Sequence, residues 1–267
     1  MVSDHDLGAF NVGVWARGDY VAEYASSTLA AGEAVLLARH REALRDATVE
    51  VGCGAGRITR VLAGLTDELV ATDVSERMAA ACRAAVPSAR VEVADMRDLS
   101  ALPDGHFGAV VALANVIDVV GDAERRALLA GFRRLLRPGG TLLVSSHNRG
   151  HVPQLTDPTF SAAELRTPSG VLRAARTAPR LALRRRNRRR ARAFEREEPE
   201  YALVNDHAHD YALVHYYVDR DAMATQLADA GLEPLEVLDA EGTVVPAGGA
   251  APASPTLHYA ALRPRLA

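Results

Sequence analysis

The chain has 267 residues, of which 48% are hydrophobic, and its formal net charge is −3 at pH 7. A chain of this size folds as one large domain, or as one domain with an insertion, and its near-neutral charge gives no electrostatic reason to bind nucleic acid or a membrane surface. Its two cysteines, Cys53 and Cys82, provide neither a metal-ligand spacing nor a disulfide framework.

Residues 1–45 are predicted to form helices ahead of the first strand, as an N-terminal helical cap. Trp15, Tyr20 and Tyr24 are prominent there because aromatic residues are only 5% of the chain. Tyr20 and Tyr24 are four residues apart and would share a helix face. Such a pair commonly packs its helix onto the body of a domain. The alternative is a lid whose tyrosines cover a bound ligand.

A glycine-rich stretch follows, in which Gly52, Gly54 and Gly56 alternate after the β-branched run at 48–51. Glycine allows a positive φ and leaves no Cβ in the way of a ligand. The helix predicted next would present unpaired N–H groups at its first turn. Such turns also occur without a ligand, and the spacing G-x-G-x-G differs from the G-x-G-x-x-G dinucleotide fingerprint. Whether this turn binds a ligand must therefore be judged from the rest of the chain.

Strands and helices alternate from here to residue 147. Strands are predicted at 68–75, 90–96, 107–115 and 141–146, with helices between them. Nearly continuous apolar strands in this rhythm indicate a parallel sheet covered on both faces, a doubly wound α/β core. Ligands bind such sheets outside the carboxyl ends of the strands. Glycines and polar residues gather at these ends: Gly52 to Gly56, Asp73, Asp95, Asn115 and His147.

The segment 148–218 interrupts this rhythm as an insertion. It contains several prolines and an arginine-crowded tract at 180–192, followed directly by glutamates. A charge-balanced stretch of this kind is typical of a solvated surface helix, whereas an RNA-binding or anion-binding patch is the alternative. Residues 211–218 have a strand pattern. The rhythm resumes at 219–267 with a helix and two strands, the last of which would lie antiparallel in the sheet.

At this point the sequence resembles the class I S-adenosylmethionine-dependent methyltransferases. The segment from Glu50 to Arg57 is similar to the family's first motif, and Asp73-Val74-Ser75 with Met78 to its second. Asp95-Met96 resembles the adenine-contacting pair, and the segment from Leu136 to Gly140 the turn before the fifth strand. The resemblance covers 44–147 well and 219–263 in pattern, whereas the insertion and the N-terminal helices match nothing diagnostic.

The resemblance implies a doubly wound, mostly parallel, seven-stranded sheet, a Rossmann-like methyltransferase core. That core would comprise 46–147 and be completed by 219–267, with 148–218 as an inserted helical and strand lid over the substrate. It also implies S-adenosylmethionine as the cofactor, bound by a set of residues on the strand ends. These are Glu50, Gly52, Cys53, Gly54, Gly56, Asp73, Val74, Asp95, Met96 and Asn115.

By resemblance, the methionine part of the cofactor lies against the glycine turn. Glu50 would hold the shape of that turn or reach the cofactor's amino group. Asp73 would accept hydrogen bonds from both ribose hydroxyls. Asp95 would accept one from the adenine amino group, while Val74 and Met96 sandwich the ring.

Methyl transfer needs mainly alignment and exclusion of water, because the cofactor supplies an activated carbon. A base is needed only where the acceptor loses a proton. The candidates near the expected methyl position are Asn115, His147 and Tyr20; His147 could take a hydroxyl proton or orient the loop after the fifth strand. The sequence Asp-His-Ala-His-Asp at 206–210 suggests a metal site only superficially, since it lacks a third ligand at fixed spacing, and no metal is expected.

The sequence favours an enzyme that methylates an oxygen or nitrogen of a small molecule. One alternative is a tRNA or rRNA methyltransferase that uses the arginine tract for phosphate contacts, which the adjacent acids and the near-neutral charge disfavour. Others are a nicotinamide oxidoreductase, disfavoured by the glycine spacing, and a protein that binds a nucleotide without catalysis.

Location and partners follow from simpler features. No apolar run approaches the roughly 18 residues of a membrane span, and the polar, acidic first residues are unlike a secretory leader. We therefore expect a cytoplasmic protein with no membrane partner. The sequence leaves the oligomeric state open, a homodimer included.

Overall fold

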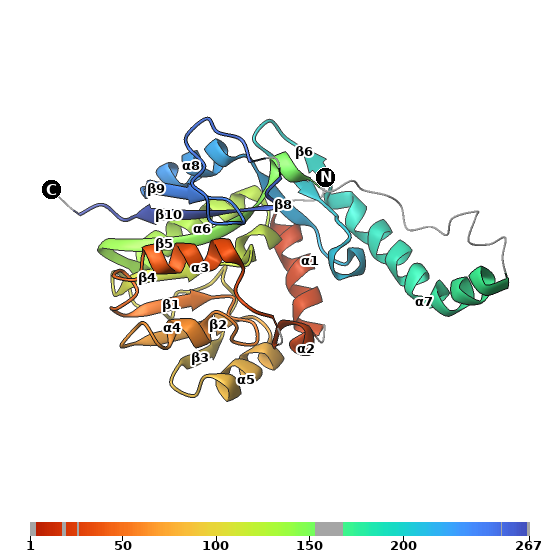
Figure 1. The fold of residues 1–267 in the computed structure, drawn as a ribbon, viewed down its shortest axis with the longest axis horizontal. Helices are drawn as coiled ribbons and strands as arrows, with labels where there is room; N and C mark the ends of the chain where they lie inside the picture. The colour runs from red at the N-terminus through yellow and green to blue at the C-terminus, as the bar shows by residue number, and fades with distance from the viewer. Residues whose placement is uncertain (1–3, 18–19, 26, 153–167, 252, 266–267) are drawn as a thin grey trace.

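The core of the protein is a mostly parallel sheet of seven strands (Figure 1). A computed structural model describes residues 4–17, 20–25, 27–152, 168–251 and 253–265. The core strands are β1 (Thr48–Val51), β2 (Leu69–Asp73), β3 (Arg90–Val93), β4 (Phe107–Ala112), β5 (Leu136–Asn148), β9 (Glu233–Leu238) and β10 (Thr256–Leu262). They lie in the order β3-β2-β1-β4-β5-β10-β9, and β10 is antiparallel to both of its neighbours. The predicted doubly wound sheet and its antiparallel closing strand are confirmed.

Helices cover both faces of this sheet. Successive residues of a strand point to opposite faces, so neighbours in sequence belong to different buried clusters. Val110 belongs to the same buried cluster as Leu129 and Phe132 of α6 (Asp122–Leu135), together with residues of α8 (Arg220–Asp229). The next residue, Val111, belongs to a second cluster with Leu36 of α3 (Ala31–Arg39) and residues next to and within α4 (Thr59–Leu62). The two clusters on opposite faces are what make the sheet doubly wound.

The remaining helices complete the cover. The helix α5 (Glu76–Ala85) packs against β2 and β3. At the N-terminus α1 (Asp4–Arg17) lies against α6, and the short α2 (Val21–Ala25) reaches α5. Three-residue and four-residue 3₁₀ turns follow several strands and helices: η1 (Val116–Val119), η2 (Arg149–His151), η4 (Arg192–Phe194) and η5 (Ala208–Tyr211).

The predicted insertion extends the sheet to ten strands. Its strands are β6 (Arg196–Glu197), β7 (Tyr201–Val204) and β8 (His215–Val218), and each pairs antiparallel with the next. The strand β8 also pairs in parallel with the end of β5, at His147 and Asn148. The helix α7 (Pro168–Ala191) projects from the body, with its C-terminal part beside η5 (Figure 1). No described helix is long and apolar enough to cross a membrane.

The strand predicted at 211–218 is shorter than expected. Only His215–Val218 forms β8, and Tyr211 closes the turn η5. His209, Asp210 and Tyr211 all have positive φ, between 51° and 60°, which no strand accommodates. The apolar pattern of the segment therefore reflects burial, because Tyr211, Leu213 and Val214 are all buried.

Candidate functional site

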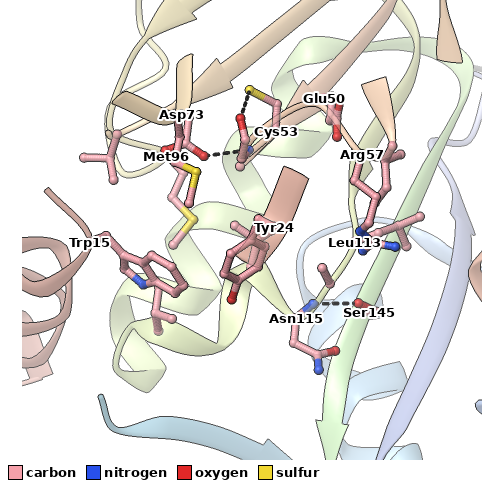
Figure 2. A pocket seen from close by; sticks show the side chains of 18 of the residues that line it. Trp15, Tyr24, Glu50, Cys53, Arg57, Asp73, Met96, Leu113, Asn115 and Ser145 are labelled. Atoms are coloured by element: carbon pink, nitrogen blue, oxygen red, sulfur yellow. Dashed lines mark hydrogen bonds between the residues drawn. The ribbon is translucent and has the colours of Figure 1, made fainter. Parts of the chain in front are cut away.

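A cavity of about 510 Å³ opens at the carboxyl ends of β1, β2, β4 and β5 (Figure 2). The loops after these strands line it, as the α/β rule on ligand sites predicts. Trp15 of α1, Tyr24 of α2 and His209 of η5 complete its wall. Its volume lies in the range of about 300–1,000 Å³ that is typical of sites for small molecules and cofactors.

The glycine turn forms one end of the cavity. Gly52, Gly54 and Gly56 all have positive φ, of 73°, 54° and 87°, which is the reason for glycine at these positions. A Cβ on Gly52 would lie 2.2 Å from Cγ2 of Val116, so the turn packs tightly against η1. A Cβ on Gly54 would meet nothing within 4 Å, so the backbone there borders open space.

Asp73, at the end of β2, lines the cavity and holds the glycine turn in place (Figure 2). Its Oδ2 accepts a hydrogen bond from the N–H of Gly54 at 2.8 Å, and its Oδ1 accepts one from the N–H of Ser75 at 2.9 Å. Burial raises the pKa of this carboxyl, against the lowering effect of the two backbone donors. Asp73 thus joins two loops at the same edge of the sheet.

Glu50 lies below the glycine turn and is only 2% exposed. Its Oε2 accepts a 2.6 Å hydrogen bond from Oγ1 of Thr59. Burial raises the pKa of Glu50 to about 8 because the charged form is poorly solvated. Nearby, Arg57 forms a fork-like ion pair with Glu33 across the cavity wall.

The residues expected around the adenine ring come together on one side. Val74, Asp95 and Met96 all line the cavity. Both oxygens of Asp95 accept hydrogen bonds from the side chain of Arg97, Oδ1 from Nε at 3.1 Å and Oδ2 from Nη2 at 2.7 Å. Although burial alone would raise it, these hydrogen bonds lower the pKa of Asp95, so the carboxyl is ionised.

Asn115 stands where β4 ends, in the left-handed region at φ 58°. Its N–H donates to Oγ of Ser145 at 2.8 Å, and its Nδ2 donates to Oγ1 of Thr256 at 3.0 Å (Figure 2). Its Oδ1 is buried and has no hydrogen-bond partner among the residues that the structure describes. A buried acceptor of this kind is suited to a donor on a ligand.

His147 lies at the end of β5 and lines the cavity. Its Nδ1 is 2.7 Å from Oδ2 of Asp118, which also accepts the backbone N–H of His147 at 2.6 Å. Asp118 is fully buried with Arg125, whose Nη1 is 2.6 Å from Oδ1. Burial would raise the pKa of Asp118, but Arg125 and His147 together lower it. Asp118 and Arg125 carry no sequence signal that we recognised.

Tyr20, the third base candidate, does not line the cavity. Its ring packs edge-on against Trp15 and His209, with centroid distances of 5.3 and 4.7 Å. Tyr24 does line it and has its hydroxyl 3.3 Å from Nε2 of His209. The helical cap and the insertion therefore meet in an aromatic cluster above the strand ends.

The sequence Asp-His-Ala-His-Asp does not converge as a unit. Asp210 pairs with arginines of α7, and His209 joins the aromatic cluster. Asp206 instead pairs with His215, Oδ2 to Nδ1 at 2.9 Å. Together with His147 these two residues bring potential metal-ligating atoms within 4.8 Å of one another, a grouping that sequence spacing did not predict.

Comparison with known proteins identifies the domain that forms the cofactor end of the cavity. Residues 49–140 match the model of the family described as "Methyltransferase domain". A probable S-adenosylmethionine-dependent methyltransferase of Mycolicibacterium smegmatis is 34% identical over 110 residues, 41% of each chain. Residues 49–140 therefore form a methyltransferase domain, and its relatives are S-adenosylmethionine-dependent methyltransferases. This methyltransferase domain contains Gly52, Gly54, Asp73 and Asp95, all of which line the cavity.

Two further relatives differ in their acceptors. A ubiquinone biosynthesis O-methyltransferase of Xanthomonas campestris pv. campestris is 32% identical over 41% of this chain and 46% of its own. A 23S rRNA (guanine(748)-N(1))-methyltransferase of Streptomyces fradiae is 37% identical over 42% of this chain and 37% of its own. The matches thus span less than half the length of these curated relatives.

Solved structures agree on the fold. The 1,6-didemethyltoxoflavin-N1-methyltransferase of Burkholderia thailandensis has a TM-score of 0.62 at 14% identity, over 99% of this chain and 92% of its own. At that identity the likeness concerns the methyltransferase fold alone. It extends beyond the residues matched by the family model.

Proposed function

We propose that this protein transfers the methyl group of S-adenosylmethionine to an oxygen or nitrogen of a small-molecule acceptor. The observation that carries the proposal is that one cavity is lined both by Gly54 and Asp73 and by His147. Cofactor and acceptor would therefore share one space, as a direct displacement between them requires. A 1,6-didemethyltoxoflavin-N1-methyltransferase of the same fold, solved with its bound small molecule, supports this class of acceptor.

The residues present fit the cofactor. The backbone at Gly54 borders open space, so a ligand can lie against it. Each oxygen of Asp73 accepts one backbone hydrogen bond, and an ionised carboxylate has about four acceptor sites, which leaves sites for two ribose hydroxyls. Asp95 and Met96 would meet the adenine. The buried carboxyl of Glu50 would hold the glycine turn through Thr59 or face the cofactor's amino group.

The bound cofactor would supply a methyl carbon activated by its sulfonium. The chain's own residues then orient the acceptor, exclude water and take up a proton where the acceptor has one to lose. Because Nδ1 of His147 lies 2.7 Å from the buried carboxylate of Asp118, Nε2 is the nitrogen that would receive that proton. The unpartnered Oδ1 of Asn115 is suited to accept a hydrogen bond from the amino group of the cofactor or of the acceptor.

The test compares cofactor affinity and turnover. Asp73→Ala should weaken S-adenosylmethionine binding by about 1–3 kcal/mol in calorimetry, the scale of hydrogen bonds to a charged group, whereas Asp98→Ala, at an exposed carboxylate outside the cavity, should not. His147→Ala should slow turnover and leave cofactor affinity unchanged. Unchanged affinity in the first variant would discard the ribose assignment, and stabilisation of the protein by NAD alone would contradict the cofactor.

An RNA acceptor is the alternative named above, and α7 carries the arginines it would need. Within the described residues, however, several of these arginines are paired with acids. Nε of Arg184 lies 2.8 Å from Oδ1 of Asp210, and Nη1 of Arg188 lies 2.6 Å from Oε1 of Glu195. Salt-sensitive retention on RNA, lost when the arginines between 184 and 190 become serine, would support this alternative over a small molecule.

A further inference from the structure

Two imidazoles stand side by side on the cavity wall, one from the core and one from the insertion. His147 ends β5, and His215 begins β8, the strand that pairs with β5. Their ring centroids are 5.0 Å apart, with the planes tilted by 38°. Both side chains line the cavity.

A buried carboxylate lies beside Nδ1 of each imidazole, as an ion-pair contact for His147 and as a hydrogen bond for His215. The distances are 2.7 Å from His147 to Asp118 and 2.9 Å from His215 to Asp206. Asp206 also accepts hydrogen bonds from the hydroxyl of Tyr217 at 2.8 Å and from the N–H of Ala208 at 2.9 Å. The hydrogen bond to Asp206 fixes the ring of His215 and its tautomer, and the contact with Asp118 places Nδ1 of His147 against a buried carboxylate. In both histidines Nε2 is therefore the nitrogen available to a ligand.

Aromatic and apolar side chains also line this cavity. They include the rings of Trp15 and Tyr24 and the side chains of Val12 and Val119. Aromatic walls favour a planar, aromatic ligand, which they contact over a large area in stacked or edge-on arrangements. Two polar nitrogens in such a space fix the orientation of that ligand and provide specificity.

We propose that His215, oriented by Asp206, is a second acceptor-binding residue, and that with His147 it selects an aromatic acceptor bearing two adjacent oxygens. This inference rests on the proposed function. His147 takes the proton of the oxygen that is methylated, while His215 forms a hydrogen bond with the neighbouring oxygen. In the transfer, the acceptor's O–H bond breaks and its proton passes to Nε2 of His147. The new O–C bond forms as the methyl–sulfur bond breaks, and the electron pair of that bond stays on sulfur.

A bound metal ion would use the same histidines differently. His147, His215 and Asp206 offer ligand atoms within 4.8 Å of one another. Both oxygens of Asp206, however, already accept hydrogen bonds within the protein, from His215, Tyr217 and Ala208. Coordination by this carboxylate would break the contacts that orient His215. The contacts therefore favour two histidines that each lie next to a carboxylate over a metal site.

The experiment measures the affinity of three probes by calorimetry, in the presence of S-adenosylhomocysteine and a chelator. They are 1,2-dihydroxybenzene, 1,3-dihydroxybenzene and phenol. We expect the protein to bind the 1,2-isomer at least tenfold more tightly than the other two. His215→Phe and Asp206→Asn should remove this preference while phenol binding persists. His106→Phe, at a surface histidine paired with Glu68, should keep it.

Each outcome has one meaning. Equal affinity for all three probes, or a preference that survives His215→Phe, overturns the inference. A preference that appears only when Zn²⁺ replaces the chelator also overturns it and assigns the cluster to a metal. S-adenosylhomocysteine binding is measured first in the unaltered protein and in every variant. If the unaltered protein does not bind S-adenosylhomocysteine, the proposed function itself is contradicted. If it binds S-adenosylhomocysteine but shows no preference for the 1,2-isomer, only the role of His215 is contradicted. Thermal unfolding of each variant identifies those that do not fold.

Discussion

Glu50 makes the stability of this protein depend on pH in an unusual direction. Its pKa is raised from 4.5 to about 8 by burial, so the folded state holds this proton more tightly than the unfolded chain. Stability from this group is therefore fully present below about pH 4.5 and falls as the pH rises toward 8. Since each pH unit corresponds to about 1.4 kcal/mol, ionisation of Glu50 in the unfolded chain costs the fold about 3 kcal/mol by pH 7.

The variant Glu50→Gln should remove this cost. Glutamine keeps an oxygen that accepts the 2.6 Å hydrogen bond from Thr59 and cannot ionise. At pH 4.5 the variant and the unaltered protein should have nearly equal free energies of unfolding in urea. At pH 7 the variant should be more stable by about 3 kcal/mol, or roughly 6–12 °C in melting temperature for a domain of this size.

Glu33→Gln is the matched control, because its pKa is shifted the other way. Burial would raise the pKa of Glu33, but hydrogen bonds from Arg57 and the N–H of Ala30 outweigh burial and lower it. Its stabilisation is present above the pKa of the unfolded chain and lost as the pH falls through the folded pKa. Glu33→Gln should therefore cost stability at pH 7 and cost less in acid. A difference for Glu50→Gln that stays constant from pH 4.5 to 8 would refute the reasoning.

Three further variants test the scaffold of the site. Gly52→Ala should destabilise the protein by at least 1–2 kcal/mol in urea unfolding, because its Cβ would lie 2.2 Å from Val116 at a positive φ. Gly54→Ala adds no collision and should cost about 1 kcal/mol while it weakens cofactor binding in calorimetry; equal stability losses in the two variants would contradict this packing. Arg125→Met leaves the buried Asp118 without its cation and should cost about 3–5 kcal/mol in the same unfolding assay, and a loss below 1 kcal/mol would show that Asp118 is neutral.

Much of the fold and of the cofactor end could be predicted because their signals are local. Alternating strand and helix patterns predicted the parallel sheet, and the antiparallel β10 followed from the closing pair of strands. Gly54 and Asp73 could be placed together because parallel strands end at one edge. The exception in pattern was the segment 211–218, where Tyr211 has a positive φ at the end of η5 and only the second half forms a strand.

The acceptor end was harder to predict, because its contacts join distant parts of the chain. Tyr20 was expected near the methyl position, but it does not line the cavity and packs edge-on against Trp15 and His209. His215 lies next to His147 because the insertion returns to β5 and its strand β8 pairs with the end of that strand. The hydrophobic periodicity of a sequence does not predict which strand end an insertion will contact.

The sequence by itself determined the α/β core, the glycine turn and the acids at the strand ends, since these depend on hydrophobic period, backbone freedom and the polarity of parallel strands. Only the tertiary structure decided which carboxylate holds which histidine. Asp118 faces His147, and Asp206 faces His215, because an η1 turn and an inserted hairpin pack against the end of β5. Those contacts arise from the packing of whole elements, which a linear sequence pattern does not specify.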